Sequence, residues 1–502
     1  MKKIALFSTV AVCSVALLVS FSSKKKAEEI AIKPIAKPVV DCAPSEAGVN
    51  LITPAEFRKR FGAEPLRTRK NVYSLNQAEI NAIKVAVLKM RALPYTDPTS
   101  WRYQAAIHGT TMTDNLPSWN TCHKSGEADF FLLWHRMYVY FFERIMRAKS
   151  GRANIAQPYW NYQQNAVMPP AYRDNTPSNP LYDGTRSSSI NNGGALPSSI
   201  MTAFNTSLNN TDFYTFQTNM NNGPHGSVHT TINGNMAVVS SAAQDPVFML
   251  HHGNIDRLWE EWRSRCGGRI NPTDATWLNR IYTFFDETGT AVSMRGSDIV
   301  EISTQLNYRY DDREPVINCT GARPVARTRE VLITKEASLS LAGNNLKANF
   351  TGGSATGLET IERTQNRRAF NFDGANVSER LVINFEGVNI QKMPQGVIEV
   401  YLNLPAGQRP SANSKYFVGL LDLFSVEHHS AHGTAEEHAN GASTEMDATQ
   451  AAKALGLTLP ELRNASISFY VRGASLKGAE VATNAQLSIQ RIKFALETQR
   501  TQ

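Results

Sequence analysis

The stretch Asp245–Asp256, which reads DPVFMLHHGNID, combines a helix start with two adjacent histidines and a carboxylate. Proline is favoured at the start of a helix, so we expect a helix to begin near Pro246 and to carry the chain to about Arg263. Asp256 lies four residues after His252, which is about one helical turn. A carboxylate at this spacing can accept the free ring N–H of a histidine that binds a metal, and this predicts a supporting role for Asp256 behind His252.

A second pair of histidines lies upstream, in the run HGSVH from His225 to His229. A spacing of four residues places two side chains on one face of a helix, one turn apart, where two imidazoles can bind the same metal ion. Such a pair is a weak signal by itself, because many pairs at this spacing face solvent.

Three further histidines, His108, His123 and His135, precede these two groups. His135 lies in a strongly apolar helix, where a buried imidazole needs a partner. The alternative is a core histidine that is satisfied by a hydrogen bond. This alternative could account for a single buried histidine, but it accounts poorly for six histidines in one domain. Imidazole ligands suit copper, zinc, iron or nickel. The chain has no His-Glu-x-x-His motif and no cysteine pair of zinc spacing, so a structural zinc site or a zinc protease is disfavoured. Two sets of three neutral imidazole nitrogens suit a pair of copper ions.

These segments resemble the tyrosinase and polyphenol oxidase family, the type 3 copper proteins. Asp245–Asp256 matches the second copper motif of that family without gaps, and Phe131–Arg136 with Glu143 matches the first. Pro158–Tyr162 and Tyr308–Tyr310 also look like family landmarks. The paired motifs are highly specific for this family.

The resemblance implies a ligand set. The first copper ion would be held by His108, His123 and His135, and the second by His225, His229 and His252, with His251 an adjacent non-ligand. The implied activity is the oxidation of catechols to o-quinones, with dioxygen as co-substrate. Full tyrosinase activity on monophenols, oxidation of o-aminophenols and haemocyanin-like oxygen binding without catalysis remain alternatives.

Several positions depart from the family pattern or tune it. Asn221 stands where relatives often carry a glutamate that holds a water thought to deprotonate phenols, and Asn can hold a water but is no carboxylate base. Gly226 offers that water no side-chain contact. Both positions favour weak monophenol hydroxylation, whereas the small Val239 at the gate position leaves substrate access open. Cys122, directly before His123, is a candidate for a thioether to a ligand ring.

The chain divides into segments by composition. Lys2 and Lys3 precede an apolar run from Ile4 to Phe21 and small residues, as in a secretory signal, although an uncleaved anchor remains an alternative. After cleavage we expect export and no stable membrane insertion. The expected boundaries are a signal peptide at 1–23, a linker at 24–60, a catalytic domain at 61–315, a linker at 316–330 and a β-rich domain at 331–500.

The expected fold is a mainly α catalytic domain followed by an all-β sandwich-like domain. Helices are predicted from the Asn76–Glu79 capping box to about 91, at 101–108, at about 130–148 and from 246, with an irregular stretch at 163–199. Strands are predicted at 331–334, 381–385, 397–402, 416–424, 466–471 and 487–494, with one helix at 449–455.

The β-rich domain resembles the extension that covers the copper mouth and keeps many polyphenol oxidases latent. His428, His429, His432 and His438 lie in a polar stretch of it, either as an auxiliary copper site or as an exposed loop. The net charge of +8 is scattered, without a basic stripe, so small phenols rather than nucleic acids are the expected partners. Four cysteines outside the leader allow two disulfides, whose pairing the spacing leaves open.

Overall fold

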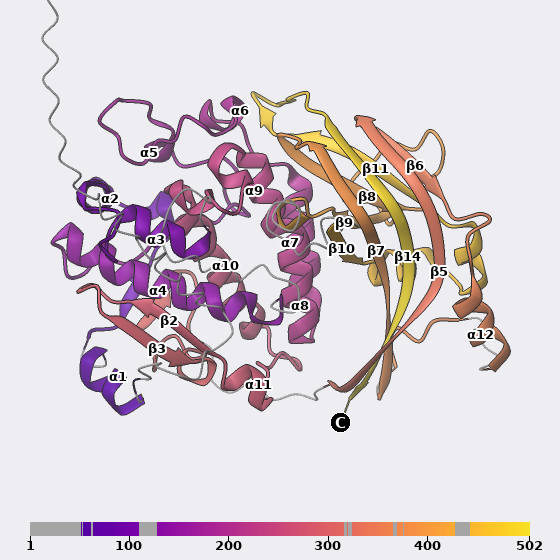
Figure 1. Ribbon diagram of the computed structural model, residues 1–502, viewed down its shortest axis with the longest axis horizontal. Coiled ribbons are helices and arrows are strands. Elements are labelled where there is room, and N and C mark those ends of the chain that lie inside the picture. Colours follow the sequence, from indigo (N-terminus) through magenta and orange to yellow (C-terminus); the bar gives the residue numbers. More distant parts are fainter. Residues whose placement is uncertain are drawn as a thin grey trace, which may run out of the picture. The chain divides into compact units, whose positions relative to one another are not determined.

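The computed structural model describes residues 52, 54–61, 64–109, 128–315, 319, 324–364, 369–374, 376–426 and 442–501 (Figure 1). Within these ranges most helices come first in the chain, and two four-stranded sheets come last. The predicted helical domain followed by a β sandwich is therefore confirmed. The predicted signal peptide lies outside the described residues, and no helix in the described ranges is long and apolar enough to span a bilayer.

Four helices that carry the core of the first domain lie where the sequence predicts them: α2 (Gln77–Ala92), α3 (Trp101–His108), α4 (Phe131–Ser150) and α10 (Val247–Ser264). The predicted capping box is formed, because Asn76 accepts from the Glu79 N–H while the Glu79 carboxylate accepts from the Asn76 N–H. Helix α4 is buried from Phe131 to Arg147, since it packs against both α2 and α10.

The segment between α4 and α10 holds more helix than predicted. Its first part is irregular as expected, with the short helices α5 (Pro170–Arg173) and α6 (Ser188–Asn191). It then forms α7 (Ser198–Asn209), α8 (Phe213–Met220), the π-helical turn η3 (Asn221–His225) and α9 (Gly226–Ile232). These elements are rich in Asn, Thr, Gly and Pro, whose helix propensity is low, so we attribute their stability to burial.

Smaller elements complete the first domain: α1 (Pro54–Phe61), α11 (Ala275–Leu278), β2 (Ile281–Phe285), β3 (Ala291–Arg295), and the 3-10 turns η1 (Val72–Ser74), η2 (Ala128–Phe130), η4 (Gly234–Ala237), η5 (Ala242–Gln244) and η6 (Gly296–Asp298). Strand β1 (Arg67–Arg69) pairs in parallel with β4 (Tyr308–Tyr310). This ladder places Arg69 beside two buried tyrosines, close to α10.

The second domain contains two antiparallel sheets, ordered β10-β7-β14-β5 and β6-β11-β8-β9 (Figure 1). Their strands are β5 (Pro324–Gly343), β6 (Asn345–Asn349), β7 (Val377–Lys392), β8 (Gly396–Leu402), β9 (Phe417–Leu420), β10 (Ala442–Asp447), β11 (Ser466–Gly473) and β14 (Ala485–Thr501), with a hairpin of β12 (Ser475–Leu476) and β13 (Ala479–Glu480). Side chains of both sheets form one apolar core, in which Phe385 meets Phe469 with ring centroids 5.7 Å apart.

Two predictions for this domain need correction. The helix α15 (Thr449–Leu455) is confirmed, but α12 (Thr356–Thr364) and the turn η7 (Pro460–Asn464) are additional. The strand predicted at 416–424 ends at Leu420, because Asp422 turns the chain out of the sheet. Its Oδ1 accepts hydrogen bonds from the N–H groups of Phe424 (3.0 Å) and Ser425 (3.4 Å). Aspartate commonly stabilises a turn in this way, at the expense of a strand.

The two domains share a buried contact beside α9. The Thr230 hydroxyl donates to the Gly396 carbonyl at 3.1 Å, and the Asn219 amide donates to the Asp447 carboxylate at 3.1 Å. Phe424 is fully buried and belongs to the apolar core of the helical domain. We call residues 421–426 the covering segment, because Phe424 packs into the core of the helical domain while Leu421, Leu423 and Val426 stay in the core of the β domain.

Candidate metal centre

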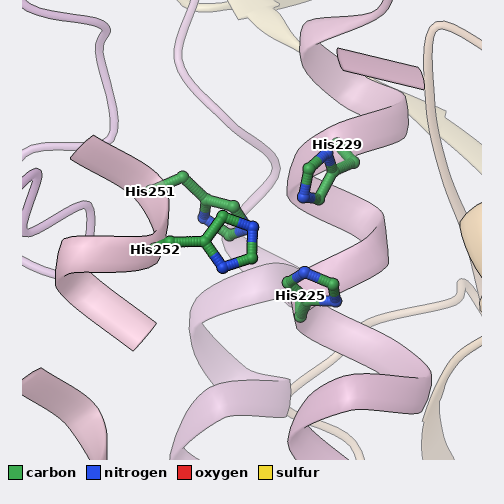
Figure 2. A group of neighbouring side chains, drawn as sticks. All are labelled: His225, His229, His251 and His252. Carbon is green, nitrogen blue, oxygen red and sulfur yellow. The ribbon is translucent and has the colours of Figure 1, made fainter. Parts of the chain in front are cut away.

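Four histidines from two helical segments meet in the helical domain (Figure 2). His225 ends the π-helical turn η3, and His229 lies one turn later on α9. His251 and His252 project towards them from α10. All four are fully buried, and one ring nitrogen of each lies within 4.8 Å of the others. The predicted shared face of His225 and His229 is thus present, with a π-helical turn before it, a feature that is frequent at functional sites.

A second group joins three helices at the same place. His108 ends α3, His135 lies in α4, and both come together with His252, again with ligand atoms within 4.8 Å of one another. The rings of His135 and His252 stack at a centroid distance of 4.2 Å. His252 therefore belongs to both groups, and the two groups form one continuous centre.

Backbone carbonyls fix the orientation of three rings. Nδ1 of His108 lies 3.0 Å from the Val239 carbonyl, Nδ1 of His135 2.8 Å from the Phe131 carbonyl, and Nδ1 of His229 2.8 Å from the Met236 carbonyl. A carbonyl can only accept, so Nδ1 carries the proton and Nε2 presents its lone pair. This tautomer is the one that binds a metal through Nε2.

The ring nitrogens that make no hydrogen bond indicate a metal site rather than a group of core histidines held by hydrogen bonds. Nε2 of His229 and both ring nitrogens of His252 have no hydrogen-bond partner in the part of the chain that the structure describes. Buried polar atoms rarely stay unsatisfied, because the loss of hydration is costly. Burial also lowers the pKa of His108 to about 4, so its imidazole is neutral and able to donate to a metal. A buried set of neutral nitrogen donors fits copper.

His251 lies closer to the centre than the sequence suggests. Its ring stacks on His225 with centroids 5.2 Å apart and lies 4.8 Å from the ring of His229, and the ring of Tyr162 lies 6.0 Å away. Unlike His252, it belongs to one of the two groups only. The shared position favours His252 as the ligand of this pair.

The predicted contact of Asp256 with a ligand ring is wrong. Its Oδ1 accepts from Arg136 at 2.5 Å, and its Oδ2 accepts from Arg69 at 3.1 Å and from the hydroxyls of Tyr308 (2.6 Å) and Tyr310 (2.5 Å). Burial opposes the ionisation of Asp256, but the two guanidinium groups and the hydroxyls outweigh it and lower its pKa. Asp256 instead joins α10 to α4 and to the β1–β4 ladder, and so positions the helices that carry His252 and His135.

The charged residues next to Asp256 form buried ion pairs with one another. Arg136 also pairs with Glu260 at 2.7 Å, while Glu143 pairs with Arg69 at 2.8 Å and Arg147 at 2.5 Å. All these side chains are at least nine-tenths buried. The pairing therefore holds α4 in register with its surroundings.

The covering segment reaches the centre directly. The ring of Phe424 stacks on His229 with centroids 4.0 Å apart and lies 5.9 Å from the ring of His225. Sequence analysis missed this residue, because it ends a run that alternates like a strand. The one available signal is Asp422, a residue disfavoured in strands and favoured in turns.

Asn221, Gly226 and Val239 are the positions that we expect to tune substrate preference, and all three lie near the candidate ligands. Asn221 is buried at the start of η3, and its Oδ1 has no hydrogen-bond partner among the described residues. A Cβ atom on Gly226 would lie 2.1 Å from Oδ1 of Asp422, so the covering segment occupies the space of a side chain there. Val239 is buried, and its backbone carbonyl is the hydrogen-bond partner of Nδ1 of His108. His123, Cys122, His428, His429, His432 and His438 lie outside the described residues.

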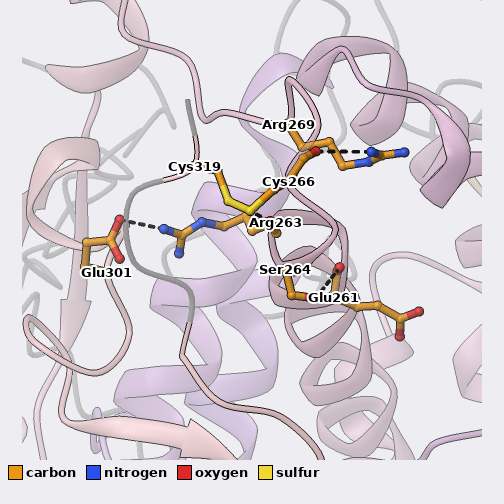
Figure 3. Close-up of a disulfide and its surroundings, with 7 residues drawn as sticks. All are labelled: Glu261, Arg263, Ser264, Cys266, Arg269, Glu301 and Cys319. Carbon is orange, nitrogen blue, oxygen red and sulfur yellow. Dashed lines mark hydrogen bonds and ion pairs between the residues drawn. A yellow bond between two sulfur atoms is a disulfide. The ribbon is translucent and has the colours of Figure 1, made fainter. Parts of the chain in front are cut away.

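One disulfide lies at the far end of α10 (Figure 3). Cys266 follows the last turn of the helix and is bonded to Cys319, with Cα atoms 5.3 Å apart. Nearby, Arg263 pairs with Glu301 at 2.6 Å. This bond gives the partners of two of the four cysteines whose pairing the spacing left open. It also ties α10, the helix of His252, to the segment before the β domain.

Comparisons with known proteins identify the family. The common central domain of tyrosinase matches residues 98–207 and 185–265, which include all six predicted ligand positions, five of them among the described residues. A tyrosinase from Hahella sp. (strain CCB-MM4) is 32% identical over 329 residues, covering 55% of this chain and 70% of that protein. The chain belongs to the tyrosinase and polyphenol oxidase family. It is therefore a copper-dependent oxidoreductase, with two copper ions and dioxygen as co-substrate.

Other matches extend over the β domain. The polyphenol oxidase middle domain matches residues 271–320, and a domain of unknown function matches residues 328–494. The latent polyphenol oxidase of Prunus armeniaca is 27% identical over 408 residues, covering 71% of this chain and 66% of that protein. The solved latent apple tyrosinase has a TM-score of 0.57 at 20% identity and covers 86% of this chain and 97% of that chain, which shows a common fold.

Proposed function

We propose that this protein oxidises catechols to o-quinones at copper ions held by His108, His123 and His135 and by His225, His229 and His252. The observation that carries the proposal is the shared position of His252, whose ring belongs to both imidazole groups. In the balanced reaction, two catechols and one dioxygen give two o-quinones and two waters. The copper pair supplies the redox chemistry when bound, while the chain orients the ligands and excludes water.

We propose catechols rather than monophenols as the better substrates. Hydroxylation of a monophenol needs the phenol to lose its proton near the metals, and a carboxylate would serve as the base. At the position where relatives often carry glutamate, Asn221 has an amide, and Gly226 adds no polar side chain. A tyrosinase with full monophenolase activity and an o-aminophenol oxidase remain the alternatives from the same family.

We further propose that the β domain keeps the enzyme latent. Phe424 lies flat on His229, where the ring of a substrate would approach the metal. The proposed domain boundaries, 61–315 and 331–500, leave a linker at 316–330. Its residues from Pro324 onward belong to β5, so cleavage ahead of Pro324 would separate the two domains and release the cover. The same burial favours the second candidate function, oxygen binding without catalysis as in haemocyanins, because it excludes substrates.

Export through the segment 1–23 remains part of the proposal. The Cys266–Cys319 bond supports it, since disulfides persist mainly in oxidising compartments. The plant relatives are chloroplastic by name, so their route of transport gives no guide to this chain.

Oxygen uptake tests the proposal. The copper-loaded protein is given 4-methylcatechol or 4-methylphenol, before and after limited proteolysis of the linker ahead of Pro324, where β5 begins. We expect uptake with the catechol, a marked rise after cleavage and little uptake with the phenol. Equal rates on both compounds would contradict the argument from Asn221. Reversible oxygen binding after cleavage, without consumption of catechol, would favour the second candidate function, oxygen binding without catalysis.

A further inference from the structure

Asp422 is a buried carboxylate with one unsatisfied oxygen. The residue has no exposed surface, and its Oδ1 accepts from the N–H groups of Phe424 and Ser425. Its Oδ2 has no hydrogen-bond donor, and Asp422 forms no ion pair with any residue in the described ranges. Burying an ionised carboxylate without a positive partner is strongly unfavourable. The turn alone therefore does not explain why this residue is an aspartate.

The position of Asp422 is next to the candidate ligands. Its Oδ1 occupies the place of a side chain on Gly226, the residue that directly follows His225. Two residues after Asp422, Phe424 stacks on His229. The covering segment thus brings a carboxylate and an aromatic ring onto the same turn of α9, beside His225 and His229, two of the three histidines proposed for the second copper site.

The positive charge missing from this environment is the one that copper would bring. The buried guanidinium groups of Arg69 and Arg136 are already paired with Asp256, Glu143 and Glu260. A bound metal ion is commonly the largest local charge in such a site, and it attracts the closest anion.

We propose that Asp422 is an anionic partner that the β domain contributes to the second copper site, so that copper binding and the packing of the covering segment stabilise each other. Asp422 is a positioning residue in this account, since it holds the segment in place and touches no substrate. The proposal rests on copper binding at the histidines and not on the identity of the phenol. By linkage, copper must strengthen the packing of the segment by the same factor by which the packed segment strengthens copper binding.

Gly226 provides the opening for this contact. A methyl group there would collide with Oδ1 of Asp422 and would also lie 3.1 Å from Cβ of Phe424. Alanine favours a helix more than glycine does, so Gly226→Ala should leave α9 intact. The variant keeps the carboxylate in the chain but forces the covering segment away from the site.

The decisive variant is Asp422→Asn in the full-length protein. Asparagine has the same shape and keeps the carbonyl oxygen that accepts from Phe424 and Ser425, so the change removes the charge and preserves the turn. Asp373→Asn is the matched control, because Asp373 lies in the same domain with an exposed side chain that pairs with Lys453. Copper binding is measured by competition with a chromogenic Cu(I) chelator.

We expect Asp422→Asn and Gly226→Ala to bind the weaker-held copper ion about 5- to 150-fold less tightly than the unaltered protein, and Asp373→Asn to bind it equally well. Hydrogen exchange at 421–426 is followed in the same samples with and without copper. Copper should slow exchange there in the unaltered protein and in Asp373→Asn, and much less in Asp422→Asn.

Two results would overturn the proposal. One is an unchanged copper affinity of Asp422→Asn, which would reduce Asp422 to a turn residue. The other is a copper effect on exchange at 421–426 that persists in full without the charge. Neither readout involves a phenol, so a failure here is distinct from a failure of the proposed oxidation of catechols.

Discussion

The ring of Phe424 lies on the imidazole of His229, with centroids 4.0 Å apart and ring planes inclined by 13°. One residue belongs to the β domain and the other to helix α9, so the contact joins the two domains at the candidate metal centre. Stacking of this kind covers the face of the imidazole and excludes water from it. A substrate that needs this face must displace the phenylalanine first.

Replacement of Phe424 by alanine should therefore raise catechol oxidation by the uncleaved protein. Burial of a phenylalanine side chain stabilises the covered state by about 1.5–3 kcal/mol. Its loss should increase the open population, and with it the rate, roughly tenfold to hundredfold, as long as the covered state dominates. Initial rates of oxygen uptake measure the change. Phe372→Ala, at a partly buried stack with Phe370 in the β domain, serves as the control and should stay latent.

Replacement of Asn221 by glutamate should increase activity on monophenols relative to catechols. The change introduces a carboxylate four residues before His225, where it can act as a base for the incoming phenol. A positioned base typically contributes about 100-fold or more to a rate, so the ratio of the two activities should rise by at least about tenfold. Asn221→Gln lengthens the side chain without adding charge, and an equal rise in that variant would refute the explanation.

Replacement of Asp256 by asparagine should destabilise the helical domain. The variant leaves the guanidinium groups of Arg136 and Arg69 buried with less negative charge around them. Breaking a buried ion pair from one side costs about 3–5 kcal/mol. Urea unfolding at pH 7 measures the loss, with Asp373→Asn as an exposed control that should unfold like the unaltered protein. A loss as small as in the control would contradict the role we assign to Asp256.

The lowered pKa of Asp256 also predicts how the stability of the fold depends on pH. The pKa of Asp256 is lower in the folded chain than its ordinary value of 3.8, because Arg136 and Arg69 outweigh the effect of burial. A lowered pKa stabilises the fold above the unfolded value, and the contribution is lost as the pH falls through the folded value. The stability difference between the unaltered protein and Asp256→Asn should thus be constant above about pH 5 and should shrink below pH 3.8. A difference that shrinks already near neutral pH would assign the effect to other groups.

Loss of the Cys266–Cys319 bond should lower stability without removing copper. The bond closes a loop with a sequence separation of 53 residues, for which loop entropy predicts a stabilisation of about 4 kcal/mol. Cys266→Ser, Cys319→Ser and the double variant should all lose the same amount in urea unfolding, because each opens the same bond. Additive losses in the double variant would show that the two thiols act separately.

The sequence predicts the parts of this site that strong local patterns encode. The helices that carry His108, His135 and His252 have clear apolar periodicity or caps, and they were placed to within a few residues. Helix α9 was not predicted as an element, although the spacing of His225 and His229 implied one turn of helix, because Gly and Pro conceal it and burial stabilises it.

The features that could not be predicted from the sequence depend on contacts between residues far apart in the chain. The partners of Asp256 come from β1, α4 and β4, far apart in the chain, so the spacing to His252 suggested a nearer but wrong partner. Phe424 and Asp422 belong to a different domain from the histidines that they approach. Their positions follow from how the domains pack, which no local pattern records.

The central claim is that two groups of imidazoles hold a pair of copper ions that oxidise catechols. A copper titration of the Phe424→Ala protein tests it most directly, with bound copper and catechol-dependent oxygen uptake measured in the same samples. We predict that uptake rises with copper and saturates at two copper ions per chain, with one dioxygen consumed for every two catechols. Saturation at one copper ion, or two bound copper ions without catechol-dependent uptake, would contradict the account.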